Sequence, residues 1–349
     1  MQIQVQQFTV HKNVPLTISR GTQGENTNLW LQIEQEGITG WGESTPFSVA
    51  VGDKMTAERL AEQVEALKPH LSPFAPWEWQ QIEGVFRAFK PHPAVQAGID
   101  VACHDWLGKR ANLPLWQMWG ADLSRIVPTS VTVGISSPEL ARQRVRQWRE
   151  VTETRAIKIK LGSPEGIEAD RAMLQGVREE APEAELTVDA NGGWTLGEAL
   201  EMMPQLVALG VRHLEQPLGV EDEGDYGALY ERALLPIFVD ESCFNSGDVA
   251  RLAGVVHGIN IKLMKSGGLR EAWRMIHMAR GLGLQVMYGC YSDSCLANSA
   301  IAQLGAFADY LDLDSHLNLK DDPFTGAVLQ AGRLIPTPQP GLGVTLKCN

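Results

Sequence analysis

The sequence contains no run of about 18 apolar residues, so we expect no membrane-spanning helix. Its first residues, MQIQVQQFTVH, lack the basic and apolar regions of a secretory signal, which predicts a cytoplasmic location. Cysteine is scarce, and its five residues are odd in number and scattered, which predicts free thiols in a reducing compartment. No Lys/Arg cluster appears and the net charge is −12, so neither nucleic acid nor an anionic membrane is expected as a partner.

The chain has 349 residues, enough for one or two domains with sizeable cores. In residues 1–47, short apolar runs alternate with Gly, Asn and Thr turns, a pattern that predicts an antiparallel meander. From about 56 to 119, leucines and alanines recur at helical spacing between prolines, and the segment 94–109 is the strongest helix there. The first third is therefore expected to be an α+β domain.

A different pattern begins near residue 127, where strand-like and helical segments alternate. The strand-like runs are VPTSVTVGI, AIKIKLG, ELTVDA, VRHLEQ, LPIFVD, GINIKLM, LQVMYG and YLDLDS. Helical stretches at 138–151, 164–180, 196–209, 247–253 and 268–281 lie between them. This alternation predicts parallel strands with right-handed crossovers. Polar residues at strand ends all the way round favour a closed barrel over an open sheet.

Charged residues close most of these strand-like runs. They are Lys160, Asp189, Glu215, Asp240, Lys262 and the pair Asp312 and Asp314. In a barrel of parallel strands, the C-terminal strand ends form one face, and active sites lie on that face. Three carboxylates and two lysines that converge there indicate a divalent-metal site flanked by two amine acid/bases. Such a site can move a proton at a carbon next to a carboxylate or carbonyl.

Lys158 and Lys160 stand two positions apart on one strand, so both are expected to face the barrel interior. Lys160, nearer the strand end, is the expected acid/base, and Lys158 is expected to hold a substrate carboxylate. The clustered positive charge is expected to lower the pKa of one amine towards that of a useful base. Solvated lysines on an exposed edge strand are the structural alternative.

Asp189, Glu215 and Asp240 form an all-oxygen ligand set of the kind that Mg²⁺ prefers, which predicts one ion per subunit. A helix N-cap is the alternative role for any one of them. Lys262 is expected to face Lys160 across an eight-stranded barrel, and Lys265 is the rival position for this second acid/base.

The series KIK, DANGGW, EQP, DES and INIKLMKSGG resembles the muconate-lactonizing subgroup of the enolase superfamily. ITGWGESTPF and AVQAGIDVACHDWLGKRANLPLWQMWG are similar to landmarks of its capping domain. The resemblance covers nearly the whole chain and implies a (β/α)7β TIM-like barrel with an α+β capping domain built from both termini. It further implies Mg²⁺ on Asp189, Glu215 and Asp240, with Lys160 and Lys262 as the acid/base pair. The expected bounds are 1–122 for the cap, completed by 323–349, and 123–322 for the barrel.

The subgroup hosts several activities, and the pair Asp312 and Asp314 distinguishes among them. Two carboxylates side by side at the barrel mouth suit a cation such as the free α-ammonium of a dipeptide, and this DxD resembles the dipeptide epimerases of the family. The expected reaction is a 1,1-proton transfer at the α-carbon of the C-terminal residue through an enediolate. Another activity of the subgroup is the alternative: o-succinylbenzoate synthase, N-acylamino acid racemase or cycloisomerase. An inactive scaffold is a further alternative.

Specificity is expected from loops near 17–28 and 44–53. Arg20 is expected to pair with an acidic substrate side chain, or Glu25 or Asp53 with a cationic one. Asp293 is a further substrate-binding candidate. The sequence leaves the side-chain preference and the pathway open, and a homo-oligomer is compatible with it.

Overall fold

A three-stranded antiparallel sheet begins the chain, as the alternating apolar runs predict. Its strands are β1 (Gln2–Ile18), β2 (Gly21–Gln35) and β3 (Ile38–Ser44), in the order β1-β2-β3. The computed structural model describes residues 1–48 and 55–347 of the chain. Asp53 and Cys348, which the sequence analysis considered, lie outside these described residues.

Four helices follow: α1 (Ala57–Leu71), α2 (Trp79–Phe89), α3 (Pro93–Ala111) and α4 (Leu115–Met118). Helices α1 and α3 pack on this sheet, α2 contacts α1, and α4 contacts α3. Helix α3 contains the expected helix 94–109. It crosses β3 so closely that a Cβ atom on Gly42 would lie 2.0 Å from the carbonyl oxygen of Gly98. Glycine is therefore required at this crossing of helix and strand.

Eight strands form the second sheet, all paired in parallel, in the order β11-β10-β9-β8-β7-β6-β5-β4. They are β4 (Ser130–Val133), β5 (Ala156–Lys160), β6 (Glu185–Asp189), β7 (Val211–Glu215), β8 (Ile237–Val239), β9 (Gly258–Ile261), β10 (Gln285–Tyr288) and β11 (Tyr310–Leu311). A parallel bridge between Thr129 and Leu311 joins the two ends of the order. The sheet therefore closes into a barrel, and each of the eight expected strands is found.

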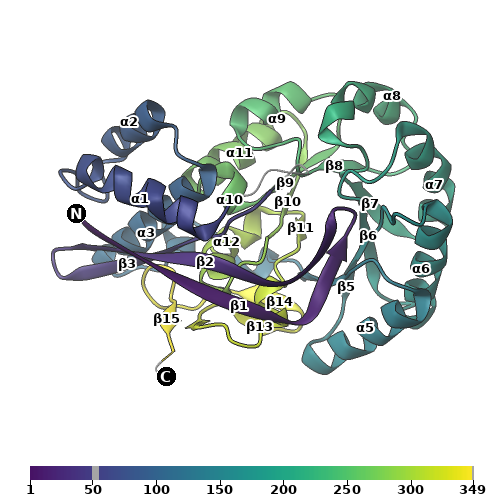
Figure 1. Cartoon of the computed structure of the whole chain (residues 1–349), viewed down its shortest axis with the longest axis horizontal. Coiled ribbons are helices and arrows are strands. Elements are labelled where there is room, and N and C mark those ends of the chain that lie inside the picture. The colour runs from purple at the N-terminus through teal and green to yellow at the C-terminus, as the bar shows by residue number, and fades with distance from the viewer. Residues whose placement is uncertain (49–54, 348–349) are drawn as a thin grey trace.

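Helices connect the barrel strands and cover the outside of the barrel (Figure 1). They are α5 (Pro138–Val151), α6 (Ile167–Glu180), α7 (Leu196–Ala208), α8 (Tyr226–Glu231), α9 (Ser246–Leu252), α10 (Leu263–Ser266), α11 (Leu269–Gly281) and α12 (Cys295–Ala302). Short 3-10 turns lie at Leu123–Arg125, Val220–Asp225, Gly305–Phe307 and Ser315–Asn318. Only the last of these turns follows β11 directly, which agrees with the expected absence of an eighth helix.

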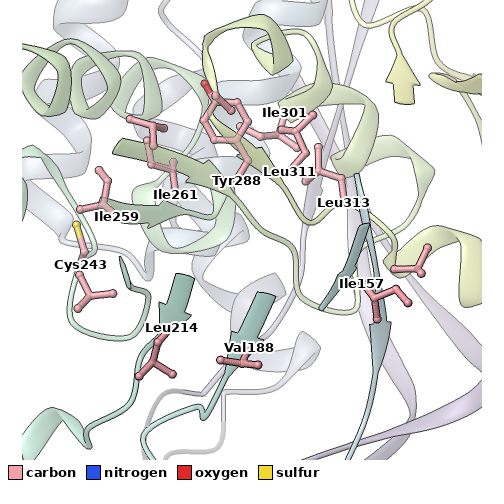
Figure 2. Packing of buried hydrophobic residues seen from close by; sticks show 14 of the residues in the cluster. Ile157, Val188, Leu214, Cys243, Ile259, Ile261, Tyr288, Ile301, Leu311 and Leu313 are labelled. Atoms are coloured by element: carbon pink, nitrogen blue, oxygen red, sulfur yellow. The ribbon is translucent and has the colours of Figure 1, made fainter. Parts of the chain in front are cut away.

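The alternation along each barrel strand separates a core from a polar interior. Figure 2 shows part of that core, with the buried side chains of Ile157, Val188 and Leu214. Since successive side chains of a strand point to opposite faces, their neighbours Lys158, Asp189 and Glu215 face the barrel interior. The hydrophobic cluster therefore fixes which residues reach the site.

The N-terminal domain packs against the barrel. Its own core of β-sheet and helix residues also includes Met264 and Ala297, which belong to barrel helices. The long β1–β2 hairpin extends to the barrel (Figure 1). At the hairpin tip, Ser19 Oγ donates a hydrogen bond to the carbonyl of Asn191 over 3.0 Å. The cap therefore contributes residues to the C-terminal face of the barrel.

The tail runs back to the N-terminal region, as the family resemblance implies. Its short strands are β12 (Phe324–Thr325), β13 (Val328–Gln330), β14 (Arg333–Ile335) and β15 (Thr345–Leu346). The backbone N–H of Leu342 donates to Asp105 of α3 over 2.8 Å. The boundaries placed at 122/123 and 322/323 stay predictions. In the part of the chain that the structure describes, no helix combines the length and apolar character needed to cross a bilayer.

Candidate active site

A cavity of about 1060 Å³ lies between the cap and the C-terminal ends of the barrel strands. The barrel contributes Lys160, Lys262, Asp312 and Asp314 to its lining, together with residues of the strand-end loops. The cap contributes Lys12, Arg20, Gln23 and Phe47, among others. Two expected acid/bases and the expected ammonium-binding pair therefore share one cavity.

Lys160 at the end of β5 is held by the neighbouring strand. Its Nζ donates to Asp189 Oδ2 over 2.6 Å, and the residue is only 6% exposed. Since a buried ammonium without a counter-charge is costly, this contact fixes the lysine beside the first expected metal ligand. Lys160 therefore lies inside the barrel rather than on a solvated edge.

Lys158 lies one layer deeper and is enclosed by carboxylates of the chain itself. Its Nζ lies 2.7 Å from Glu215 Oε2, 2.8 Å from Asp312 Oδ2 and 3.1 Å from Asp189 Oδ2. It is fully buried and is not among the residues that line the cavity. The expected contact of Lys158 with a substrate carboxylate stays a prediction, and that carboxylate would have to compete with the three acidic side chains that surround the ammonium.

Acidic groups raise the pKa of two buried lysines, Lys158 and Lys262. Burial alone would lower the pKa of Lys158, but Asp312, Glu215 and Asp189 raise it well above its usual value. For Lys262, the opposing effects are again burial and a carboxylate, that of Asp240, and the pKa is raised. The neighbouring ammonium groups have less influence on these pKa values than the carboxylates do.

The pKa values of the acidic side chains shift in opposite directions. Burial and the charge of Asp189 raise the pKa of Glu215 to about 7. The pKa of Asp240 is lowered, because Lys262 and Lys265 outweigh its burial. Asn260 donates to Glu215 Oε1 over 2.7 Å and fixes the orientation of that carboxyl group.

Lys262 and Lys265 both lie beside Asp240, but only one of them reaches the cavity. Lys262 Nζ donates to Asp240 Oδ2 over 2.7 Å and lies 4.4 Å from the centroid of the Tyr291 ring. Lys265 donates to the backbone carbonyls of Asp240, Cys243 and Asn260, and it is absent from the cavity lining. Lys265 therefore stabilises the loop after β8, and of the two lysines only Lys262 lines the cavity.

Two residues with positive φ follow the acidic side chains. Asn191 has φ 46° and Gln216 has φ 34°, which are uncommon values for residues other than glycine. Gln216 Oε1 accepts from the backbone N–H of Asp240 over 2.8 Å, so it ties the end of β7 to the end of β8. Sequence reasoning did not single out Gln216, although its place directly after Glu215 was a signal.

Asp312 and Asp314 lie just beyond the end of β11, and both line the cavity. Ser130 Oγ donates to Asp312 over 2.9 Å, and the backbone N–H of Thr132 donates to Asp314 over 2.7 Å. Burial and the charge of Asp312 raise the pKa of Asp314 to about 6. The sequence analysis missed Ser130, whose spacing of two from Thr132 on one strand was the available signal.

Arg20 at the tip of the β1–β2 hairpin reaches the cavity, but it already has a carboxylate partner. Its Nη2 lies 2.7 Å from Glu241 Oε1, and its Nη1 donates to the carbonyl of Asn191 over 2.9 Å. The Asn191 side chain donates to Asp189 Oδ2 over 3.2 Å. Pairing of Arg20 with a substrate carboxylate therefore has to compete with Glu241.

The remaining candidates do not line the cavity. Asp293 is buried, and its Oδ2 accepts from the backbone N–H of Tyr291 over 3.1 Å, so it shapes the loop after β10. Glu25 on β2 is exposed and lies 3.5 Å from His11. The role of Asp293 in substrate binding therefore has no contact to support it, and Glu25 faces solvent.

The chemistry of the three acidic side chains fits a hard cation, although lysine ammonium groups now separate them. Asp189, Glu215 and Asp240 are fully buried, and each has an oxygen close to a lysine: Glu215 Oε2 lies 2.7 Å from Lys158 Nζ, and Asp240 Oδ1 lies 2.5 Å from Lys265 Nζ. Within residues 1–48 and 55–347, no three acidic, His or Cys side chains gather closely enough to form a ready-made metal cluster. Lys158 and Lys160 occupy part of the space between the acids.

Comparison with known families accounts for nearly the whole chain. The model of the mandelate racemase/muconate lactonizing enzyme N-terminal domain matches residues 2–120, and that of the enolase C-terminal domain-like family matches residues 139–349. A hydrophobic dipeptide epimerase of Roseobacter litoralis is 42% identical over 99% of both chains. An L-Ala-D/L-Glu epimerase of Bacteroides thetaiotaomicron is 32% identical over 94% of this chain and 83% of the relative.

Solved structures of epimerases share the fold. The dipeptide epimerase of Enterococcus faecalis in complex with Mg and L-Leu-L-Tyr superposes with a TM-score of 0.90 at 31% identity, covering 99% of each chain. That of Cytophaga hutchinsonii with Mg and D-Ala-L-Val gives a TM-score of 0.92 at 26% identity over 99% of this chain and 95% of the other. By its domains and relatives, the chain belongs to the mandelate racemase/muconate lactonizing enzyme family of the enolase superfamily and is an isomerase of the epimerase and racemase type.

Proposed function

We propose that the protein is a dipeptide epimerase that inverts the α-carbon of the C-terminal residue of a dipeptide. The observation that carries the proposal is the pair Lys160 and Lys262. Both ammonium groups line one cavity, and each is bound to a different buried carboxylate, at 2.6 Å and 2.7 Å. Two amines anchored on separate strands can serve the two faces of one substrate carbon.

The activities named for two relatives support the same reaction. The epimerases of Roseobacter litoralis and Enterococcus faecalis act on or bind dipeptides, as their names state. Asp312 and Asp314 suit the free ammonium that distinguishes a dipeptide from N-acylated or fully anionic substrates. Their place in the same cavity as the two lysines therefore favours a dipeptide.

Asp189, Glu215 and Asp240 would hold one Mg²⁺ through their carboxylate oxygens, which are buried and lie beside lysine ammonium groups. When bound, the ion supplies a Lewis acid for the substrate carboxylate and offsets the negative charge that otherwise raises the pKa of Lys262. Asn260 and Gln216 fix the positions of the acidic groups by their hydrogen bonds to Glu215 and to the backbone of Asp240.

The two lysines carry out the proton transfer. One amine, in its neutral form, accepts the α-proton, and the charge left behind is delocalised as an enediolate of the substrate. The opposite ammonium then donates a proton to the other face of the carbon, which produces the epimer. Burial excludes water from this step, since Lys160 and Lys262 are each only 6% exposed.

The surroundings of the reacting carbon suit an apolar C-terminal side chain. Phe47 and Tyr291 stack with ring centroids 4.7 Å apart, and the Tyr291 ring adjoins Lys262. Arg20, the cation that would attract an acidic side chain, is engaged by Glu241. This arrangement agrees with the hydrophobic dipeptides named for the relatives of highest identity reported above.

A library of L,L-dipeptides in deuterated water tests the proposal. With Mg²⁺ present, we expect incorporation of deuterium at the α-carbon of the C-terminal residue and formation of the L,D-isomer, fastest for apolar C-terminal residues. If an N-acyl amino acid exchanged its α-proton for deuterium and no dipeptide did, one of the other activities of the subgroup would be favoured instead.

A further inference from the structure

Lys12 is a cation of the cavity for which the reaction described above has no use. It lies on β1 of the cap, lines the cavity and is 7% exposed. The described part of the chain buries five lysines to this extent, namely Lys12, Lys158, Lys160, Lys262 and Lys265. Among these, Lys12 alone has no carboxylate within ion-pair distance. Its counter-charge is therefore missing.

Lys12 makes fewer hydrogen bonds than its ammonium group can donate. Its Nζ donates to Ser292 Oγ over 2.7 Å, and a lysine ammonium has three donors. Ser292 in turn donates to Gln23 Oε1 over 3.3 Å, so two polar neighbours from the cavity wall fix its orientation. Burial lowers the pKa of Lys12 to about 8, which measures the cost of keeping this charge away from water.

The local backbone directs Lys12 towards the barrel. The β1–β2 pairing joins His11 to Glu25 and next joins Leu16 to Gln23, so the residues between His11 and Leu16 bulge out of the ladder. Within this bulge, Lys12 forms an antiparallel bridge with Leu319 instead. Irregularities of this kind re-aim side chains and are frequent beside active sites.

The bulge lies against the segment that carries the ammonium-binding pair. Val14 and Asn318 exchange two hydrogen bonds, over 3.2 Å and 2.8 Å, and Asn318 follows Asp314 by four residues. Ser292, the partner of Lys12, belongs to the loop after β10, in which Cys290 Sγ donates to the carbonyl of Asp312 over 3.2 Å. Lys12 thus lies on the side of the cavity where the N-terminal residue of a dipeptide would bind.

We propose that Lys12 binds a carboxylate on the side chain of the N-terminal residue, so that the protein prefers dipeptides with Asp or Glu at that position. The inference rests on the proposed function. A substrate carboxylate would supply the missing counter-charge, and charged hydrogen bonds at a buried site discriminate strongly against a neutral isostere. Arg20 is already paired with Glu241, so this selection applies to the N-terminal residue and not to the C-terminal one.

The test compares L-Glu-L-Leu, L-Gln-L-Leu and L-Ala-L-Leu as substrates of the Mg²⁺-loaded full chain. We expect kcat/KM for the Glu dipeptide to exceed that for the Gln dipeptide by about tenfold or more. In Lys12→Met and Lys12→Gln, this ratio should fall towards one, while in Lys320→Met, which removes an exposed lysine next to the same segment, it should persist. Because the readout is a ratio, either variant of Lys12 suffices if the other fails to fold.

The outcomes separate the two proposals. Exchange with the Ala and Gln dipeptides without any advantage for Glu would overturn the role of Lys12 and leave the epimerase proposal intact. An equal loss for all three dipeptides in the Lys12 variants would also overturn it, because the lysine would then hold the peptide backbone or the fold. Absence of exchange and of calorimetric binding for all three would overturn the proposed function and this inference together.

Discussion

Arg20 Nη2 and Glu241 Oε1 lie 2.7 Å apart and join the tip of the cap hairpin to the loop after β8. Arg20 is about a fifth exposed and Glu241 is buried, so the pair sits at the wall of the cavity rather than in open solvent. The burial of Arg20 would lower its pKa, but Glu241 more than compensates and raises it. The ion pair therefore holds a permanent cation that is unavailable to a substrate carboxylate.

Release of Arg20 should change the preferred C-terminal residue. We expect Glu241→Gln to raise kcat/KM for L-Ala-L-Glu relative to L-Ala-L-Leu by about tenfold, because the freed guanidinium gains a substrate carboxylate as partner. In the double variant Arg20→Met/Glu241→Gln the gain should disappear. An unchanged ratio in Glu241→Gln would show that the side chain of the C-terminal residue does not contact Arg20.

Removal of divalent metal should abolish proton exchange, and Mg²⁺ should restore it, since three acidic side chains converge beside the lysines. Added Mg²⁺ should also raise the Tm, because a ligand that binds only the folded state stabilises it. In Glu215→Gln, we expect the Mg²⁺ concentration for half-maximal stabilisation to increase by about tenfold or more. Glu65→Gln, on an exposed face of α1, serves as the control, and an equal response of both variants would argue against a role of Glu215 as ligand.

His213 should make the fold sensitive to acid. Burial lowers the pKa of this imidazole to about 3, whereas the unfolded chain binds the proton near pH 6.5. The unfolded state therefore holds more protons between these values, and stability decreases as the pH falls through this window, by about 2 kcal/mol at pH 5 from this group. In His213→Leu, the decrease in free energy of unfolding between pH 7 and pH 5 should be smaller by that amount.

Urea unfolding at both pH values measures this effect. The exposed His277 provides the control, since His277→Leu should leave the difference between the two pH values as it is in the wild type. Equal acid sensitivity in His213→Leu and the wild type would show that His213 becomes protonated in the folded protein.

The crossing of β3 and α3 predicts a sharp contrast between two glycines. An added Cβ on Gly42 would overlap the Gly98 carbonyl at 2.0 Å, whereas one on Gly84 in α2 would meet no atom within 4 Å. We expect Gly42→Ala to reduce the free energy of unfolding by about 3 kcal/mol or more. Gly84→Ala should increase it by about 0.5–1 kcal/mol, through helix propensity. Denaturant unfolding distinguishes these outcomes, and similar values for both would contradict the packing described.

Local signals in the sequence predict the elements of the barrel well. Helix α5 begins and ends at the expected residues, because Ser137 caps it and Pro138 occupies its first turn. Five charged residues at strand ends are also predictable from their regular spacing, because each parallel strand is followed by a similar turn into a helix. They are Lys160, Asp189, Glu215, Asp240 and Lys262. The fold and the placement of these residues in one interior were therefore accessible from the chain.

Partners far apart in the sequence were not accessible. Arg20 and Glu241 are separated by 221 residues, and Lys158 meets Asp312 across 154 residues. Whether a lysine is enclosed by acidic groups depends on such contacts, so the sequence revealed neither the three acidic neighbours of Lys158 nor the place of Lys12 in the cavity. The backbone bulge that turns Lys12 inward has no distinct composition that sequence reasoning could use.

Stereospecific proton exchange in single-lysine variants tests the central claim most directly. With both L,L- and L,D-isomers of one dipeptide in deuterated water, the account predicts that Lys160→Ala loses exchange for one isomer and retains it for the other, and that Lys262→Ala shows the reciprocal pattern. Normal exchange of both isomers in Lys160→Ala would contradict the claim that the two amines act on opposite faces of one carbon.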